Sequence, residues 1–206
     1  MENKQYQIQK FLKIHVHEVV NLHILRFQNF FLTSLGNDFL NVLYAAILEQ
    51  PGRIAYVALD QNNRVIGFVV GVDNSSGLYL RIIRQNFLKF FRVSFLQILR
   101  RPSVLLHVLA VLLHKKDTTM QNNGNTSLLM SLAVSEQSSS RGLGKALVSR
   151  FADNAKERNC GSVVLTTDAL NNDGVNAFYE KCGFHVSVQQ MVHGRLMNTF
   201  VLSLKN

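Results

Sequence analysis

The sequence predicts a single domain of the α/β class (α+β), with one central sheet covered by helices. Two runs rich in β-branched residues, 54–59 and 65–72, are joined by turn residues at 60–63, which predicts a β-hairpin. Residues 142–159 carry apolar side chains at helical spacing. The chain has 206 residues, enough for one sizeable core, and shows no internal repeat.

The remaining elements follow from local patterns of apolar, polar and turn residues. Further strands are expected at residues 6–10, 128–134, 162–167, 184–191 and 196–204. Further helices are expected at residues 15–31, 38–49 and 173–181. Breaks are expected at Thr33-Ser34, Gly36-Asn37 and Pro51-Gly52, because these residue types favour turns and end helices.

Composition places the chain among folded proteins with an anionic partner. Hydrophobic residues make up 47% and charged residues 17%, which excludes a disordered chain. The net charge of +9 favours a phosphorylated cofactor, nucleic acid or a membrane surface, and charge alone does not choose among them. The longest uncharged apolar run, 103–113, is short of the ~20 residues that span a bilayer. Met1 to Gln5 lack a signal-peptide pattern, and Cys160 and Cys182 form no CxxC pair, so we expect a cytoplasmic protein with reduced thiols.

Residues 134–144 run from a predicted strand through a small, polar loop into a predicted helix. Gly142 and Gly144 allow the backbone to approach a ligand closely. Free N–H groups at a helix start suit a pyrophosphate, and Arg141 and Lys145 add positive charge beside them. Taken alone, this pattern is also compatible with an ordinary strand-to-helix turn.

A second segment, residues 172–184, favours a ligand-binding loop over an ordinary strand-to-helix turn. It reads Asn-Asp-Gly-Val-Asn-Ala-Phe-Tyr-Glu-Lys-Cys-Gly-Phe. Together the two segments resemble the GNAT superfamily of N-acetyltransferases, with its Leu-Ala-Val strand, its Q/R-x-x-G-x-G/A loop and its Asn…Phe/Leu-Tyr-Glu-Lys-x-Gly-Phe ending. The resemblance is specific over residues 128–204 and looser over residues 6–72. Residues 77–125 have no counterpart in the family's minimal pattern.

The resemblance implies one acetyltransferase domain over residues 1–206, with a mixed, mostly antiparallel sheet of about six to seven strands flanked by helices. It implies an acyl-CoA N-acyltransferase that uses acetyl-CoA as co-substrate. Residues 77–125 would form a basic helical insert and a mobile loop within the domain. The Asn-Phe-Phe-Leu-Thr-Ser-Leu-Gly segment at 29–36 resembles that of family members in bacterial surface-polysaccharide gene sets.

The resemblance also implies roles for individual residues. Tyr179 matches the family's general acid, although a tyrosine that packs in the core and shapes the cofactor site is the alternative. Asn172 matches a cofactor-contacting asparagine, and it also suits a helix N-cap. The oxyanion is expected to bind backbone N–H groups of residues 130–134, on a strand that splays from its neighbour. The implied cofactor-binding residues are Leu132, Ala133, Val134, Ser139, Ser140, Arg141, Gly142, Leu143, Gly144, Lys145 and Asn172.

Two features depart from a simple match. Ser139 occupies the family's Q/R position, so a long side chain is missing there, with Arg141 as a compensating cation.

No general base is evident from the sequence. The candidates are Asp168, Glu49, Glu18, His15, His17 and His23. Each also suits a surface or capping role, and the amine can lose its proton to water. No metal is expected, because the HExxH pattern lacks its second histidine at Asn21.

The insert carries most of the positive charge. Residues 80–117 hold eight Lys or Arg and one acidic residue, Asp117. As a helix, residues 81–100 place the basic positions within a sector of about 160°, opposite apolar positions that include Phe87 and Phe91. A second helix is expected after Arg101-Pro102 and a mobile loop at 117–125. Three interpretations stay open: a packed insert, a lid for an anionic acceptor such as a nucleotide-linked amino sugar, and peripheral contact with an anionic membrane. DNA binding is disfavoured, because no groove-reading motif is present.

These observations predict an N-acetyltransferase that moves the acetyl group from acetyl-CoA directly to a primary amine of a small molecule. Cys182 has no neighbouring base in the sequence, so an acyl-enzyme is not expected. The alternative is a non-catalytic CoA-binding or peripheral membrane-surface module with the same fold. The last strands could pair across subunits in a homodimer.

Overall fold

The computed structural model describes residues 6–28, 30–74, 77–100, 125–138, 142–192 and 194–204. The expected second helix of the insert lies outside the described residues. The same holds for most of the expected mobile loop and for the predicted cofactor residues Ser139, Ser140 and Arg141.

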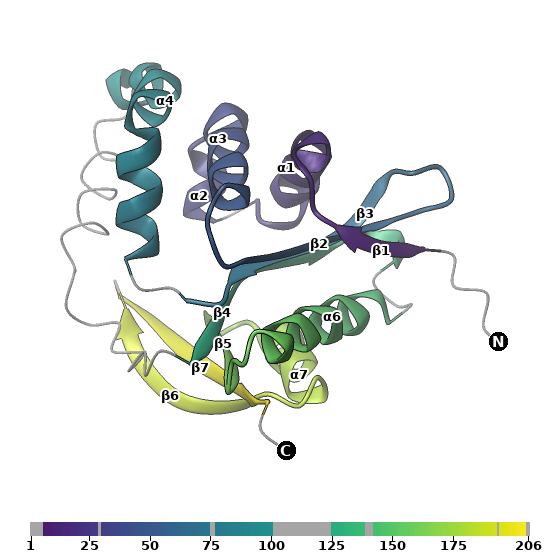
Figure 1. Ribbon diagram of the computed structural model, residues 1–206. Helices are drawn as coiled ribbons and strands as arrows, with labels where there is room; N and C mark the ends of the chain where they lie inside the picture. The colour runs from purple at the N-terminus through teal and green to yellow at the C-terminus, as the bar shows by residue number, and fades with distance from the viewer. Residues whose placement is uncertain are drawn as a thin grey trace.

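A seven-stranded sheet with the order β1-β2-β3-β4-β5-β7-β6 forms the centre of the molecule (Figure 1). The strands are β1 Gln7–Lys10, β2 Arg53–Leu59, β3 Val65–Val72, β4 Thr126–Val134, β5 Ser162–Asp168, β6 His185–Val192 and β7 Arg195–Ser203. Only β4 and β5 are parallel, and all other neighbours in this order are antiparallel. The predicted mixed, mostly antiparallel sheet is therefore confirmed.

Helices cover both faces of the sheet. They are η1 Lys13–His15, α1 Val16–Arg26, α2 Phe31–Ser34, α3 Asn37–Leu48, α4 Leu78–Arg100, η2 Glu136–Ser138, α6 Leu143–Glu157 and α7 Asp173–Lys181. Figure 1 shows α1, α2, α3 and α4 on one side of the sheet and α6 and α7 on the other. Of the described helices, none is both long enough and apolar enough to cross a membrane.

The first predicted helix is shorter than expected. The sequence predicts a helix over 15–31, whereas α1 ends at Arg26 and Phe27 leaves the helical region. The carbonyl of Phe27 accepts a hydrogen bond from Thr33 Oγ1 at 2.6 Å, which satisfies a backbone group near the helix end. The break expected at Thr33-Ser34 is wrong, because both residues belong to the short helix α2.

Two hydrophobic clusters form the core, one on each face of the sheet. Val20, Leu40 and Phe68 belong to the cluster under α1 and α3. Leu147 and Phe151 belong to the cluster under α6. Burial of each such side chain contributes roughly 2–3 kcal/mol. Because both faces are covered, the central strands are continuous apolar runs rather than alternating ones.

Helix α4 is fixed to α3 through a buried glutamine. Gln50 is fully buried, and its Nε2 donates to the carbonyl of Ala46 at 3.2 Å and to Gln85 Oε1 at 2.9 Å. Its Oε1 accepts a hydrogen bond from Arg81 Nε at 2.9 Å. The first half of α4 is therefore packed against the domain.

The faces of α4 differ in part from the prediction. Phe87 and Phe91 are 58% and 51% exposed and share the outer side with Arg84, whereas the sequence places both phenylalanines opposite the basic sector. Asn86 has non-helical dihedral angles (φ −122°, ψ 20°) and interrupts the regular 100° rotation on which that prediction rests. Phe90 packs inward, with its ring centroid 5.1 Å from that of Phe39.

Candidate active site

The parallel strands β4 and β5 pair at one end and then separate. Their register covers Thr126–Leu128 opposite Ser162–Val164, although β4 continues to Val134 and β5 to Asp168. Along its other edge β4 stays paired with β3 as far as Val134. Backbone groups of β4 that point toward β5 therefore have no partner on β5 beyond Leu128, and we call this unpaired stretch between the two strands the opening.

A β-bulge lies in β4 at this opening. Val70 faces Ser131 and Gly71 faces Leu129, so Met130 is the extra residue. Met130 packs against the cluster under α1 and α3, and Ser131 Oγ is 3.4 Å from Tyr44 Oη of α3. The bulge thus directs two consecutive side chains to the same face of the sheet.

The predicted cofactor residues at the end of β4 are paired with β3. Leu132, Ala133 and Val134 face residues 67–69 of β3. Leu132 and Val134 pack toward the cluster under α6, and Ala133 packs toward the opposite one. Their remaining main-chain groups lie along the opening.

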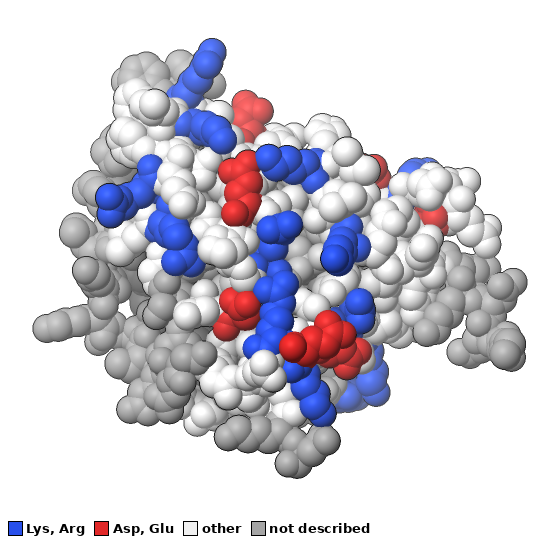
Figure 2. Space-filling view, viewed as in Figure 1, with Lys and Arg blue, Asp and Glu red and all other residues white. Residues whose placement is uncertain are grey.

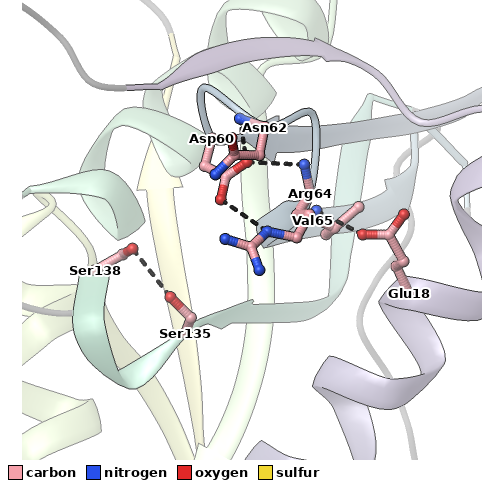
Figure 3. A network of polar contacts seen from close by, with 7 residues as sticks. All are labelled: Glu18, Asp60, Asn62, Arg64, Val65, Ser135 and Ser138. Atoms are coloured by element: carbon pink, nitrogen blue, oxygen red, sulfur yellow. Dashed lines mark hydrogen bonds and ion pairs between the residues drawn. The ribbon is translucent and has the colours of Figure 1, made fainter.

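The loop after β4 begins with an ordered turn. Ser135 N donates to the carbonyl of Ile66 at 2.7 Å, and Ser135 Oγ donates to Ser138 Oγ at 2.9 Å (Figure 3). Gly142 then occupies the N-cap position of α6 in the left-handed region (φ 68°). Gly142 has no side chain with which to cap the first turn, and the N–H groups of such a turn suit an anion. Lys145 is exposed in the same turn.

The two glycines of this loop serve different purposes. A Cβ on Gly142 would meet nothing within 4 Å, whereas a Cβ on Gly144 would lie 3.1 Å from the ring of Phe178. Gly144 therefore permits close packing of α7 on α6. Leu143 is fully buried and anchors the helix start in the core.

Tyr179 lies in the core on the α6 side of the sheet. It is 7% exposed, and its ring centroid lies 5.1–6.0 Å from those of Phe178, Phe184 and Phe200. Burial raises the pKa of the Tyr179 hydroxyl, so the group keeps its proton at neutral pH. The packing fits a Tyr179 that shapes the cofactor site, and the retained proton fits a Tyr179 that acts as a proton donor.

Asn172 occupies the N-cap position of α7, but its side chain does not cap the helix. Instead its Nδ2 donates to the carbonyl of Asp168 at 3.3 Å, and Asn176 Nδ2 donates to the same carbonyl at 3.1 Å. Asn176 Oδ1 in turn accepts a hydrogen bond from Thr167 Oγ1 at 2.7 Å. The capping prediction for the Asn172 side chain is therefore wrong, because the nearby end of β5 offers it a carbonyl.

The acidic candidates for a general base all have partners. Asp168 Oδ1 accepts a hydrogen bond from Arg195 Nε at 2.8 Å, and Arg195 Nη2 contacts its second oxygen. Glu49 pairs with Lys13 at 2.6 Å, and this hydrogen bond lowers the pKa of the carboxyl group. Glu18 Oε2 accepts a hydrogen bond from Val65 N at 2.8 Å (Figure 3).

Two of the three histidine candidates have ordinary surroundings. His17 is exposed. His15 is buried, which lowers its pKa, and its Nδ1 accepts a hydrogen bond from Leu12 N at 3.1 Å. Its Nε2 lies 3.3 Å from Gln9 Nε2.

His23 differs from both. Its Nδ1 is 2.8 Å from Tyr44 Oη, and burial lowers its pKa to about 4. In the described part of the chain, His23 Nε2 is the buried side-chain nitrogen without a hydrogen-bond partner. Sequence reasoning missed Tyr44 and Ser131, because no local signal joins residues that lie 21 and 87 positions from their partners.

Neither cysteine is set up as a nucleophile. Cys160 and Cys182 are free thiols, and burial raises the pKa of both, which disfavours the thiolate. Among the described residues, no three His, Cys, Asp or Glu side chains gather in a way that could hold a metal ion. A pocket of about 200 Å³, lined by Lys10, Arg53 and others, opens on β1 and β2, with β3 between it and β4.

Comparison with known proteins identifies the family. The model of the acetyltransferase (GNAT) family matches residues 16–184. Among solved structures, Ard1 from Thermoplasma volcanium has a TM-score of 0.61 at 16% identity, covering 98% of this chain and 99% of that one. Aminoglycoside 6'-acetyltransferase type Ii has a TM-score of 0.63 at 14% identity, covering 97% and 98%. A protein described as a streptothricin acetyltransferase from Bacillus anthracis, in complex with acetyl coenzyme A, has a TM-score of 0.50 at 20% identity, covering 78% and 67%.

A search of curated protein sequences finds no match to the chain. Because the family model covers most of its length, the chain belongs to the acetyltransferase (GNAT) family. It is therefore an acyl-CoA N-acyltransferase, and the co-substrate of this family is acetyl-CoA.

Proposed function

We propose that this acetyltransferase moves the acetyl group from acetyl-CoA directly to a primary amine of a small, anionic molecule such as a nucleotide-linked amino sugar. The opening between β4 and β5 carries the proposal, because backbone donors of β4 have no partner on β5 there and the strand leads into the start of α6, whose N-cap residue is Gly142. A thioester carbonyl beside β4 would have such donors preorganised for its oxyanion.

Pyrophosphate binding is assigned to the α6 start and to the loop before it. The proposed set comprises the backbone of Leu132, Ala133 and Val134, together with Ser139, Ser140, Arg141, Gly142, Leu143, Gly144, Lys145 and Asn172. The open N–H groups after Gly142 and the exposed Lys145 support this assignment. Gly144 contributes through packing of α7, as its contact with Phe178 indicates.

Transfer then needs two proton movements. The uncharged amine attacks the carbonyl carbon, a C–N bond forms, and the C–S bond breaks as the tetrahedral intermediate collapses. The nitrogen loses one proton to water, and we assign protonation of the leaving sulfur to the Tyr179 hydroxyl. Burial raises the pKa of this hydroxyl, which keeps it protonated at neutral pH and also makes it a weaker acid, and water returns the proton after transfer. Neither cysteine has the low pKa that an acyl-enzyme route would need.

The charge on the acceptor side supports an anionic acceptor. Helix α4 contains Arg81, Arg84, Lys89 and Arg92 and no acidic residue, and Figure 2 shows basic side chains over the α4 corner of the molecule, at the upper left. Arginine suits phosphate because its guanidinium binds two oxygens at once. We therefore assign residues 77–125 to an acceptor-binding insert within a single domain of residues 1–206.

The test is release of CoA from acetyl-CoA, followed with a thiol reagent, across a matched panel of amines. A nucleotide-linked amino sugar should be acetylated at a higher kcat/KM than the same amino sugar without its nucleotide. Arg84→Glu should reduce that preference, and Lys156→Glu, on the far half of α6, is the matched control. A preference for cationic polyamines or aminoglycosides would overturn the proposed acceptor class.

The further partners and location belong to the same proposal. We place the protein in the cytoplasm of a bacterium and infer a homodimer through β6. This edge strand exposes Val186, Val188 and Met191. Sedimentation should give the mass of a dimer for the wild type and the mass of a monomer for Val188→Lys.

Peripheral contact with an anionic membrane is a second proposed role of α4, and the exposed side chains of Phe87 and Leu88 favour it. Salt-sensitive sedimentation with anionic vesicles tests it. The non-catalytic alternative is not favoured by the family match.

A further inference from the structure

Three neutral polar groups connect α1 to the bulged strand β4. His23 Nδ1 lies 2.8 Å from Tyr44 Oη, and Tyr44 Oη lies 3.4 Å from Ser131 Oγ. His23 is 5% exposed and Tyr44 is 2% exposed. Burial lowers the pKa of His23 and raises that of Tyr44, so both side chains are uncharged at neutral pH.

We assign the histidine tautomer from the hydrogen bond that Tyr44 makes with Ser131. Tyr44 has one hydroxyl proton, which it donates to Ser131 Oγ. With that assignment the imidazole donates from Nδ1 to Tyr44 Oη, and Nε2 carries a lone pair. This nitrogen is a buried acceptor without a partner in the described structure. Leaving such a group unpaired costs about 1–3 kcal/mol, so a ligand that donates a hydrogen bond to it would recover this energy.

Contacts also connect His23 to residues on both β4 and β5. Through Tyr44 it reaches Ser131 on β4. In the other direction its ring lies 4.7 Å from that of Phe27, which lies 5.3 Å from that of Phe30. Arg195 stacks on Phe30 at 5.8 Å and binds Asp168 at the end of β5 (β5 pairs with β7 over its whole length). Contacts from His23 therefore reach β4 at Ser131 in one direction and β5 at Asp168 in the other.

The two faces of the opening are not equivalent. The start of α6, which we assign to the cofactor, and the core around Tyr179 occupy the α6 face. The amine would then approach the thioester from the other face of the sheet, which α1 and α3 cover (Figure 1). His23, Tyr44 and Ser131 all belong to that face.

We propose that His23 Nε2 binds the acceptor amine by accepting one of its N–H protons, with Tyr44 and Ser131 as positioning residues that hold the imidazole in the required tautomer. This inference rests on the proposed direct transfer to an amine. A hydrogen bond from the amine nitrogen to Nε2 orients the nitrogen lone pair toward the thioester carbonyl. The contact requires the uncharged imidazole, because an imidazolium has no lone pair to offer.

The decisive variant is His23→Asn. Its amide nitrogen can take the place of Nδ1 and donate to Tyr44, while the side chain is too short to replace Nε2. We expect kcat/KM for the amine to fall about tenfold or more, the value of one lost hydrogen bond, with an unchanged Kd for acetyl-CoA. His185→Asn, an exposed histidine on β6, is the control. An unchanged kcat/KM together with a higher unfolding temperature would overturn the proposal, since Nε2 would then be only an unpaired core atom.

A second measurement does not depend on the variant. In wild-type protein with labelled histidine, nitrogen NMR should show His23 as the Nδ1–H tautomer, with an Nε2 resonance that shifts when CoA and an unreactive acceptor analogue are both added. A fixed resonance overturns the proposal. Both experiments use whichever amine of the panel the wild type acetylates. Failure of the anionic class alone would therefore contradict the proposed acceptor and not the role of His23.

Discussion

Acid should destabilise this protein through His23, and the size of the effect follows from its burial. The pKa of His23 falls from 6.5 to about 4 because the buried imidazole loses its hydration. An unfolded chain binds a proton at this residue below pH 6.5, whereas the folded chain does so only near pH 4. His23 therefore contributes full stability above pH 6.5, and this contribution is lost as the pH falls toward 4.

The difference of about 2.5 pH units corresponds to roughly 3 kcal/mol, a large part of the 5–15 kcal/mol that is typical of a domain. The assay is urea unfolding at pH 7 and at pH 4.5, for the wild type and for His23→Asn. Glu49 and Asp60, whose pKa values are lowered by their hydrogen bonds, also titrate in this range, but they do so equally in both proteins.

The wild type should lose about 2–3 kcal/mol more than the variant between the two pH values. A parallel loss in both proteins, within about 0.5 kcal/mol, would refute the reasoning, because it would mean that His23 is protonated as easily in the folded chain as in the unfolded one.

Two further predictions concern Tyr179 and the pairing of β3 with β4. Tyr179→Phe removes the hydroxyl, so kcat should fall about 10- to 100-fold. The ring that packs in the core is kept, so the affinity for acetyl-CoA and the unfolding temperature should change little. An unchanged kcat in steady-state assays would remove the proton-donor role. Gly71→Ala places a Cβ 2.0 Å from the carbonyl oxygen of Leu128 and 2.8 Å from the ring of Phe151. The clash with the carbonyl oxygen can be relieved only by moving the backbone of a paired strand, which costs stability. It should destabilise the protein by about 3 kcal/mol or more in urea unfolding, whereas Gly174→Ala, which meets nothing within 4 Å, should change stability by less than about 1 kcal/mol. Equal unfolding midpoints for the two alanine variants would contradict the described strand pairing.

The main elements follow from the sequence because their signals are local. The hairpin of β2 and β3 is specified by β-branched runs and a polar turn, and α6 is specified by a repeat of a few residues. The loop before α6 and the segment from Asn172 to Phe184 each lie within one short stretch, so the family could be recognised from them. Family membership then implies the co-substrate and the reaction.

Other features depend on contacts that no short stretch contains. The kink at Asn86 changes which aromatic residues of α4 are buried, and Gly144 is small because Phe178 of another helix lies against it. The partner that draws the side chain of Asn172 away from its cap is a carbonyl at the end of β5. In each case a neighbouring element supplies the energy that local propensity does not include.

The sequence by itself determined the fold class, the family and the position of the acyl-transfer segments, because each depends on residues that are close along the chain. Only the tertiary structure decided where the pairing of β4 with β5 ends. His23, Tyr44 and Ser131 acquire a role only when α1, α3 and β4 pack together, since Tyr44 and Ser131 are 87 positions apart. Burial at that junction leaves the histidine neutral and, in the described part of the chain, one of its nitrogens without a hydrogen-bond partner.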